Sequence, residues 1–408
     1  MNNKHQFVNS INRHCLCQTL DRSLLEKELL SRLGDDLFLK NYPNMFSQTA
    51  VYISEFTMKE VVDLIDKIES AIHSDSFQDE VLKDVPGIAL KDFGPAGAFM
   101  GYDFHLTDSG PQLIEINTNA GGGLLNLYLS QAQLACCDGA KIPFNLDNLE
   151  KEYFQMFVNE WKLQKGEEKF QTVAIIDISP KDQYLYPEFK LFRSLFKKNG
   201  LECFILAPED LKGNDVGIWY GEIKIDLIYN RLTDFYFEQS EHNFLKDAYL
   251  KQSVVVTPNP HHHALYANKH NLVPLCKLPE LSSGIPQTII VSTENHDMLW
   301  KNRRDYFFKP SKGFGSKGAY RGDKMTHRVW SEVKASDYVA QRIVKPGERI
   351  VKIEDGQNKL KVDVRAYTYQ GKIQLMSSRL YSGQTTNFRT DGGGFAPVFL
   401  MEDTKKYD

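Results

Sequence analysis

The chain of 408 residues lacks several features that would restrict its function. No apolar run approaches the length of a transmembrane helix. The first residues, MNNKHQFVNSINRHCLCQTLDR, lack the apolar core of a signal peptide. Six cysteines are too few in so long a chain for a disulfide framework, and the net charge of −4 gives no general attraction to nucleic acid or anionic membranes. We therefore predict a cytoplasmic protein with reduced thiols and with neither nucleic acid nor membrane as a partner.

The composition also lacks any strong bias. Apolar residues make up 42% of the chain and charged residues 25%, which are ordinary values for a globular protein. We find no internal repeat and no low-complexity segment. The length predicts two or three structural units with ample core.

Helical periodicity dominates the first part of the chain. From about Phe7 to Lys83, apolar residues recur at three- and four-residue spacing with charges between them. Helices are expected to start near Leu20–Asp21 and near Thr57. Two later segments, LLNLYLSQAQLACC and LEKEYFQMFVNEWKLQK, are also expected to be helical.

The pattern changes at Thr172. The run TVAIIDIS is typical of a buried parallel strand. A helical segment that stops at Gly200 follows, and then two more strand-like runs, LECFILAP and IKIDLIYNR. This succession predicts an open α/β unit. After residue 260 a helix is expected at YANKHNLVPLCKL, and strands at YFFKP, YVAQRIV, KVDVRAYTYQG and KIQLMSSRLYSG.

Two acids and an amide alternate with apolar residues in GYDFHLTDSGPQLIEINTN, which predicts two strands around the turn DSGP. Glu115 and Asn117 share one face because residues i and i+2 of a strand point the same way, and the isoleucines beside them point to the core. Asp103 lies across the hairpin from Glu115. Oxygen ligands in this arrangement suit Mg²⁺. The alternative is an ordinary hairpin with its polar face in water.

Four glycines and four basic residues occur in FFKPSKGFGSKGAYRG, directly after a predicted strand. Glycines let the backbone approach a phosphate and turn its N–H groups inward. The spacing is not that of a Walker loop, and no parallel strand and helix frame supports a dinucleotide site. The alternatives are a phosphate loop and a glycine-rich hairpin with solvated lysines. Lys309, at the end of the strand, favours the phosphate loop.

The segment KPSKGFGSKGAYR resembles the nucleotide-covering loop of ATP-grasp ligases, above all that of glutathione synthetases and related carboxylate–amine ligases. That family holds ATP between two α+β lobes. The segment SDYVAQRIVKPGE resembles the hinge strand that binds adenine through backbone groups. The ATP-binding residues that the resemblance implies are Lys269, Lys309, Ser311, Gly313, Gly315, Ser316, Lys317, Gly318, Gln341, Arg342 and Val344.

Three further segments agree with this resemblance. GYDFHLTDSGPQLIEINTN resembles the closing metal motif of the family, an acid followed by Glu-x-Asn. KVDVRAYTYQGKIQLMSSRLYSGQTTNFRTDGGG resembles its catalytic strands, and IDLIYNRLTD resembles a strand end that contacts substrate. The implied residues are Asp103, Glu115 and Asn117 for two Mg²⁺ ions, Arg379 and Asn387 for catalysis, and Arg231, Gly121 and Gly122 for substrate.

The order of these segments departs from the family pattern, in which Glu-x-Asn comes last. Here it precedes the α/β unit, so the chain resembles a circularly permuted ATP-grasp protein, and the strand bearing Glu115 is expected to pair beside the strands at 363–381. Permutation costs little when the original termini lie close together. The resemblance implies an α+β / α/β fold with a helical N-terminal segment at 1–95, a permuted part of the C-lobe with helices at 96–165, an α/β pre-ATP-grasp domain at 166–260, a nucleotide lobe at 261–340 and the rest of the C-lobe at 341–408.

The resemblance also implies an activity. It is that of an ATP-dependent ligase that joins a carboxylate to an amine or thiol through an acyl phosphate and releases ADP and phosphate. Two alternatives stay open: a phosphotransferase that acts on a small molecule, and a non-catalytic nucleotide-binding protein with the same fold. The expected partners are small-molecule or peptide carboxylates and amines. The oligomeric state stays open, with a homodimer as the commonest assembly of soluble enzymes.

Three other groups of residues receive structural interpretations. His261 to His263 cannot converge on one ion from a strand, so they are interpreted as a polar loop. Cys136 and Cys137 are predicted to be core thiols on a helix. Arg365 faces the same side of its strand as Asp363, and the two are interpreted as an ion pair or as a support for the site.

Overall fold

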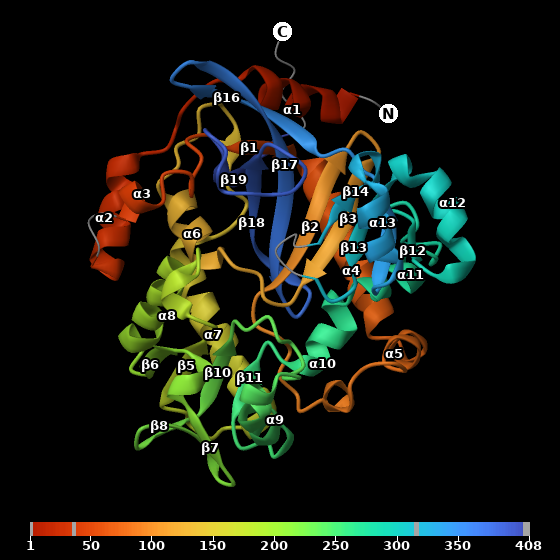
Figure 1. The fold of residues 1–408 in the computed structure, drawn as a ribbon. Helices are drawn as coiled ribbons and strands as arrows, with labels where there is room; N and C mark the ends of the chain where they lie inside the picture. Colours follow the sequence, from red (N-terminus) through yellow and green to blue (C-terminus); the bar gives the residue numbers. More distant parts are fainter. Residues whose placement is uncertain (1–2, 35–37, 314–317, 403–408) are drawn as a thin grey trace.

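The computed structural model describes residues 3–34, 38–313 and 318–402. Its largest element is a sheet in the order β1-β19-β18-β17-β2-β3, with β16 beside β17 and β4 beside β19 (Figure 1). β1 runs parallel to β19, and the other pairs are antiparallel. The bounds are β1 Val51–Ser54, β2 Met100–Thr107, β3 Gly110–Asn117, β4 Ala140–Lys141, β16 Gly347–Ile353, β17 Gly356–Tyr369, β18 Lys372–Tyr381 and β19 Gly394–Met401.

Five α-helices lie in the N-terminal part of the chain that the structure describes, and α1 and α4 among them pack against this sheet. The five are α1 Asn3–His14, α2 Arg22–Leu33, α3 Phe38–Asn41, α4 Glu55–Ile72 and α5 Asp75–Val81. Ser54 caps α4, because its Oγ accepts a hydrogen bond from the Thr57 amide at 3.0 Å. The prediction of a purely helical segment at 1–95 is wrong at β1. A four-residue apolar strand has no periodicity of its own, and its partner β19 comes from the other end of the chain.

The predicted α/β unit is present as a parallel sheet in the order β11-β10-β5-β6. Edge-to-face contacts of Phe157 and Phe192 with Tyr229 join its helices to its central strand. A small antiparallel sheet, β7-β8-β9, was not predicted. The bounds are α7 Leu146–Lys165, β5 Thr172–Ile176, α8 Tyr186–Lys198, β6 Glu202–Leu206, β7 Lys212–Asn214, β8 Gly217–Tyr220, β9 Ile223–Ile225, β10 Leu227–Asn230, α9 Asn243–Leu250 and β11 Val255–Thr257.

A third unit is built on the antiparallel sheet β12-β15-β13-β14. Its bounds are α10 Pro260–His262, α11 Leu272–Leu275, β12 Thr288–Ile290, α12 His296–Lys301, β13 Tyr306–Pro310, β14 Tyr320–Arg321, α13 His327–Lys334 and β15 Tyr338–Arg342. The single helix predicted across YANKHNLVPLCKL is wrong. It breaks at Asn268, whose side chain accepts from the His270 amide at 3.1 Å in competition with helical bonding.

Helix α6 (Gly123–Gln131) starts just beyond the β2–β3 hairpin. It ends before the cysteines, so the prediction that Cys136 and Cys137 lie on a helix is wrong. The chain there pairs instead with the N-terminal arm, since the Leu134 amide donates to the Thr19 carbonyl at 3.0 Å. Neither α6 nor any other helix in the described part of the chain is long and apolar enough to cross a membrane.

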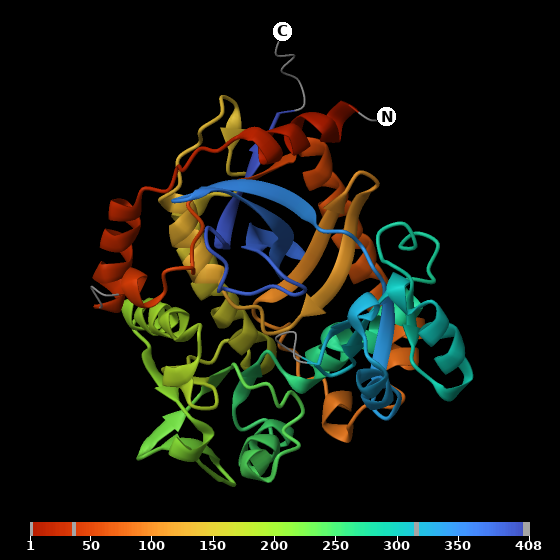
Figure 2. The same ribbon diagram turned by 45° about the horizontal axis from the view of Figure 1, so that its top comes forward.

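β2 and β3 extend the large sheet beside β17, which is the strand pairing that the permutation hypothesis requires (Figure 2). The register shifts after Asp103, so that Ile114 becomes the extra residue of a β-bulge. Ile114 is consequently half-buried rather than in the core, and Leu113 takes the core position. The pairing agrees with the prediction, whereas the permutation itself stays a hypothesis.

Candidate active site

The acids and the amide of the hairpin converge on one face of β2 and β3. Asn117 Nδ2 lies 3.2 Å from Asp103 Oδ2 and 3.4 Å from Glu115 Oε1. Asp103 is 2% exposed, and the Glu115 side chain is 30% exposed. The three side chains converge, whereas polar groups on a solvated hairpin face would splay into water, but Asn117 turns its amide nitrogen and not its oxygen toward the acids. That these residues bind metal stays a prediction.

Two arginines hold Asp103. Arg365 binds it in a bidentate pair, with Nε 2.6 Å from Oδ1 and Nη2 2.7 Å from Oδ2, and Arg379 Nη2 lies 2.8 Å from Oδ2. Of the two interpretations of Arg365, an ion pair with Asp363 is therefore wrong, whereas Arg365 does support an acid of the predicted site. Arg365 lies directly opposite Asp103 in the sheet, whereas Asp363 lies opposite Arg379.

Asp363 anchors a second polar group beside the first. It accepts hydrogen bonds from Tyr381 at 2.8 Å and Thr386 at 2.5 Å, and His105 Nε2 lies 2.9 Å from its Oδ1. Burial alone would raise the pKa of Asp363, but His105 and Arg379 hold that pKa well below its usual range. The other ring nitrogen of His105 lies 2.9 Å from the Val344 carbonyl, so this group connects the large sheet to the predicted hinge.

Lys309 reaches from the third unit to the hairpin. Its Nζ donates to the Gln341 Oε1 at 2.8 Å and to the Ile114 carbonyl at 3.0 Å. The bulge explains the second contact, because the extra residue is left out of the strand ladder. Burial lowers the pKa of Lys309 to about 8, against the opposing effect of the nearby Glu115. Burial would raise the pKa of Glu115, but Lys269 and Lys309 lower it to about 2.

Lys269 lies beside the predicted phosphate loop. Its Nζ donates to the Gly313 carbonyl at 2.7 Å and lies 3.8 Å from Glu115 Oε2. The Ser311 hydroxyl donates to Asp337, and the Gly318 carbonyl accepts from Tyr338. The structure thus brings the two predicted lysines and the start of the loop together next to the acids. The predicted residues Gly315, Ser316 and Lys317 lie outside the described residues.

The predicted adenine hinge covers the end of β15, which holds Gln341 and Arg342, and the residues after it, which include Val344. Gln341 lies between β12 and β13 in the sheet, and its buried side chain positions Lys309. The Arg342 amide already donates to the Gln287 carbonyl at 2.8 Å, and the Arg342 side chain is exposed and pairs with Asp305. The Val344 carbonyl faces His105. A direct backbone contact of these residues with adenine stays a prediction.

Arg231 lies beside the glycines that follow the β2–β3 hairpin. Arg231 is 8% exposed, and its Nε has no hydrogen-bond partner among the described residues. A Cβ at Gly121 would lie 2.3 Å from Leu185 Cδ1 and 2.9 Å from Arg231 Nη2, so glycine lets these two side chains approach the backbone. The buried Glu188 accepts from the Gly122 amide at 2.8 Å and caps α6. Burial raises the pKa of Glu188 against the effect of Arg231.

Sequence reasoning did not identify Glu188. A signal for it exists, because Glu188 shares the apolar stripe of its helix with Leu191 and Leu195 at helical spacing, and an acid on such a stripe is buried.

Asn387 was predicted from the sequence, but its side chain makes hydrogen bonds within its own loop. Its Nδ2 donates to the Ser382 carbonyl at 2.7 Å, and its Oδ1 accepts from the Arg389 amide at 2.9 Å. A catalytic role for Asn387 stays a prediction.

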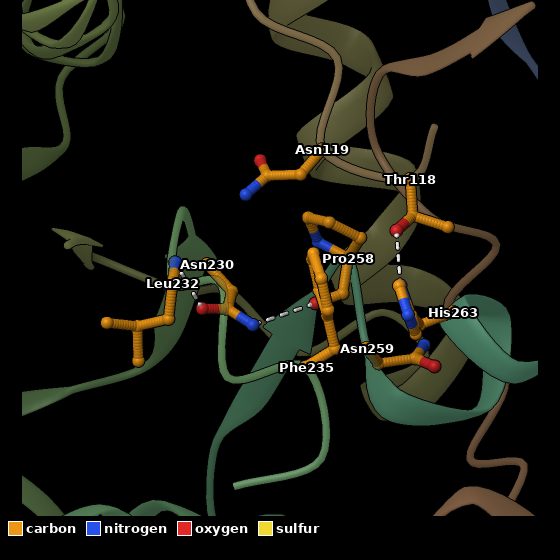
Figure 3. Close-up of a pocket in the computed structure, with 8 residues that line it drawn as sticks. All are labelled: Thr118, Asn119, Asn230, Leu232, Phe235, Pro258, Asn259 and His263. Atoms are coloured by element: carbon orange, nitrogen blue, oxygen red, sulfur yellow. Dashed lines mark hydrogen bonds between the residues drawn. The ribbon is translucent and has the colours of Figure 1, made fainter. Parts of the chain in front are cut away.

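A small pocket with polar and apolar side chains in its lining lies between the end of the hairpin and the ends of β10 and β11 (Figure 3). The interpretation of the histidine triplet as a polar loop is wrong, because His261 and His263 are buried in helical turns. His263 stacks on Phe235 and lies 3.2 Å from the Thr118 hydroxyl. Burial lowers the pKa of His263 to about 3, so the ring is neutral at pH 7. The pocket is lined by Thr118, Asn119, Asn230, Leu232, Phe235, Pro258, Asn259 and His263.

Two solved structures resemble this chain over most of its length. A glutathione synthetase-like effector from Globodera pallida aligns with a TM-score of 0.55 at 12% identity, over 95% of this chain and 100% of its own. A protein from Methylobacillus flagellatus KT, provisionally named a gamma-glutamylcysteine synthetase, aligns with a TM-score of 0.50 at 11% identity, over 81% of this chain and 83% of its own. No family model and no curated protein matches the chain.

Similarity at such low identity establishes the fold alone. The chain has the mixed α/β fold of ATP-grasp proteins, as its sequence predicted. Among proteins of this fold, it is similar to structures named as a glutathione synthetase-like effector and a gamma-glutamylcysteine synthetase.

Proposed function

We propose that this protein is an ATP-dependent ligase that joins a carboxylate to an amine or a thiol through an acyl phosphate. One observation carries the proposal: two lysines of the nucleotide-lobe region meet an acid of the large sheet. Lys269 Nζ lies 3.8 Å from Glu115, and Lys309 Nζ contacts the Ile114 carbonyl beside it. A triphosphate needs such cations for its oxygens and, on its other side, acids that hold its counter-ion.

Mg²⁺ is the ion that this set of carboxylate and amide side chains suits in type, although Asn117 would have to turn its Oδ1, in place of the Nδ2 that now faces the acids, toward the ion. Glu115 and Asn117 would hold it. Asp103 fits less simply, because Arg365 donates to both of its oxygens and Arg379 donates to Oδ2 as well, so an arginine contact would have to be given up for the ion. Bound Mg²⁺ neutralises charge on phosphate oxygens. Two ions, as the sequence resemblance implies, are part of the proposal.

The remaining roles follow from the positions of the side chains. Lys269, Lys309 and the loop that starts at Ser311 would bind the phosphates. Arg379 would stabilise negative charge that develops as the substrate carboxylate attacks the γ-phosphate. The reaction forms an oxygen–phosphorus bond and breaks the bond to ADP. An amine or thiol then displaces phosphate from the acyl phosphate, and it gives up a proton. Arg231, beside the backbone of Gly121 and Gly122, would bind an acidic group of the substrate.

Replacing Lys309 tests the proposed nucleotide site. We expect Lys309→Ala to weaken binding of a non-hydrolysable ATP analogue by about 1.5–3 kcal/mol, the value of a hydrogen bond to a charged group. Isothermal titration calorimetry measures the affinity directly. Lys334→Ala, at the exposed end of α13, removes the same charge from the same unit and should leave the affinity unchanged. Equal affinity of Lys309→Ala and the parent protein would remove Lys309 from the site.

The affinity for the analogue should also depend on pH. Free Lys309 loses its proton as the pH rises through about 8, whereas phosphate binding favours its charged form. We therefore expect the affinity to fall about twofold between pH 7 and 8 and by up to about tenfold per pH unit well above 8. Lys309→Gln should remove this slope. A slope that persists in Lys309→Gln would assign the titration to another group.

A non-catalytic nucleotide-binding protein is the second candidate function. The observation in its favour is the double arginine contact of Asp103, which reduces the number of free acidic oxygens. ADP release separates the two functions. A ligase releases ADP when pools of amino acids, small peptides and polyamines are supplied with ATP and Mg²⁺, whereas a binding protein binds the analogue but releases no ADP with any pool.

A further inference from the structure

Four cysteines gather away from the hairpin acids. Cys15 and Cys17 follow α1, and Cys136 and Cys137 lie in the loop between α6 and β4. The sulfur atoms of Cys15, Cys17 and Cys136 all lie within 4.8 Å of one another. Cys136 Sγ lies 3.3 Å from Cys15 Sγ and 3.5 Å from Cys137 Sγ. Residues distant in the sequence therefore place three thiols at one point, with the thiol of Cys137 beside that of Cys136.

The surroundings hold these thiols in place. Arg349 is fully buried, and its guanidinium donates to the carbonyls of Cys15 and Asn12, which fixes the arm after α1. The Tyr52 hydroxyl lies 2.9 Å from Cys136 Sγ. Cys17 is exposed and the other three cysteines are half-buried, so an ion has a path from solvent.

We propose that Cys15, Cys17 and Cys136, with Cys137 in reach as a fourth ligand, form a thiolate site for a soft metal ion of the Zn²⁺ type. Thiolates bind Zn²⁺ at about 2.3 Å, so ligand sulfurs lie roughly 3.8 Å apart, which the observed limit allows. Soft thiolate ligands select such ions over Mg²⁺. Binding releases the thiol protons and needs no oxidant. The ion would link the N-terminal arm to the loop after α6.

A disulfide is the competing use of these cysteines. The distance between Cys15 and Cys136 would permit one after a small movement, but a disulfide uses two thiols and leaves Cys17 and Cys137 unexplained. The third sulfur, brought to the same point by the Cys-x-Cys spacing, favours the metal. Reduced protein binds Zn²⁺ if the cysteines form a metal site, and it binds no Zn²⁺ if they serve only to form a disulfide. Metal binding by the reduced protein therefore distinguishes the two uses.

Metal titration of the reduced, chelator-treated full chain tests the proposal. With Co²⁺ as the probe, we expect one ion per chain, a thiolate-to-cobalt charge-transfer band and the d–d bands of a tetrahedral site, all displaced by Zn²⁺. Cys15→Ser combined with Cys136→Ser should lower the affinity by at least about a hundredfold, because even the loss of a group that only supports a ligand costs 10–100-fold. Cys276→Ser, which changes a half-buried cysteine of the third unit, should leave the titration unchanged.

Circular dichroism establishes that each variant folds. If the double variant does not fold, Cys17→Ser at the exposed ligand replaces it, and it should also weaken binding and shift the charge-transfer band. The proposal is overturned if the reduced parent protein shows no charge-transfer band. It is also overturned if the band keeps its intensity in the folded variants, or if the thiols form a disulfide on mild oxidation while the reduced protein binds no Co²⁺ or Zn²⁺.

Discussion

Glu115→Gln should reduce ADP release by roughly a hundredfold or more, because the charge stabilisation that a bound metal ion supplies in the transition state is worth several kcal/mol. The affinity for the ATP analogue should change far less, since the ion acts mainly on charge that develops during transfer. The change keeps the shape of the side chain and one acceptor oxygen. A Mg²⁺ titration of ADP release measures both the rate and the Mg²⁺ requirement, and the variant should need more Mg²⁺.

Stability must be measured in the same variant. The pKa of Glu115 is lowered to about 2 in the fold from an ordinary 4.5, so its ionised form stabilises the protein above about pH 4.5, and this stability is lost as the pH falls toward 2. Glu115→Gln should therefore unfold at a lower urea concentration at pH 7. Glu332→Gln, an exposed change on α13, is the control for both assays. Parent-like turnover with the same Mg²⁺ dependence would show that the hairpin is only structural.

Arg365→Met should lower the free energy of unfolding by about 3 kcal/mol, because removing one partner of a buried pair leaves the other charge uncompensated. The side chains of Asp103 and Arg365 are 3% and 9% exposed, and two hydrogen bonds join them. Arg379 remains beside Asp103, which places the loss at the low end of the usual range. Urea denaturation at pH 7 measures it.

A double variant identifies the cause of this loss. Asp103→Asn combined with Arg365→Met removes both charges, so its loss should be smaller than the sum of the single losses by more than about 1 kcal/mol. Arg328→Met, which removes an exposed pair with Glu332, should cost less than about 1 kcal/mol. Additive losses at Asp103 and Arg365 would show that the pair contributes no coupling energy.

The sequence was sufficient to predict the groups that meet at the site but not all of their partners. Lys309 and Glu115 lie in segments with distinctive residue types, and the strands that carry them have clear patterns. The contact between Asp103 and Arg365 depends on the register of β2 against β17, between residues 262 positions apart. Hydrophobic alternation predicts the two strands, but it does not predict which residues lie opposite each other.

Local structure was least predictable where side chains compete with regular backbone bonding. The bulge at Ile114 redirects one carbonyl to Lys309, and the Asn268 side chain breaks a helix that the apolar pattern favours. β1 was missed because its pairing with β19 is a tertiary contact. The histidines after β11 were predicted as a polar loop because three consecutive side chains of a strand cannot converge on one ion. They lie instead in helical turns, where a ring nitrogen of His261 lies 2.7 Å from the Ala89 carbonyl.

Transfer of carboxylate oxygen to phosphate tests the proposed ligase activity most directly. The protein is incubated with ATP, Mg²⁺, an amine mixture and pools of amino acids and small peptides whose carboxylates carry ¹⁸O, and the released phosphate is analysed by mass spectrometry. An acyl phosphate leaves one carboxylate oxygen on the phosphate, so we predict one ¹⁸O atom per phosphate with the parent protein and a greatly reduced yield with Glu115→Gln. Release of ADP with only unlabelled phosphate, or no release of ADP with any pool, would contradict the proposal.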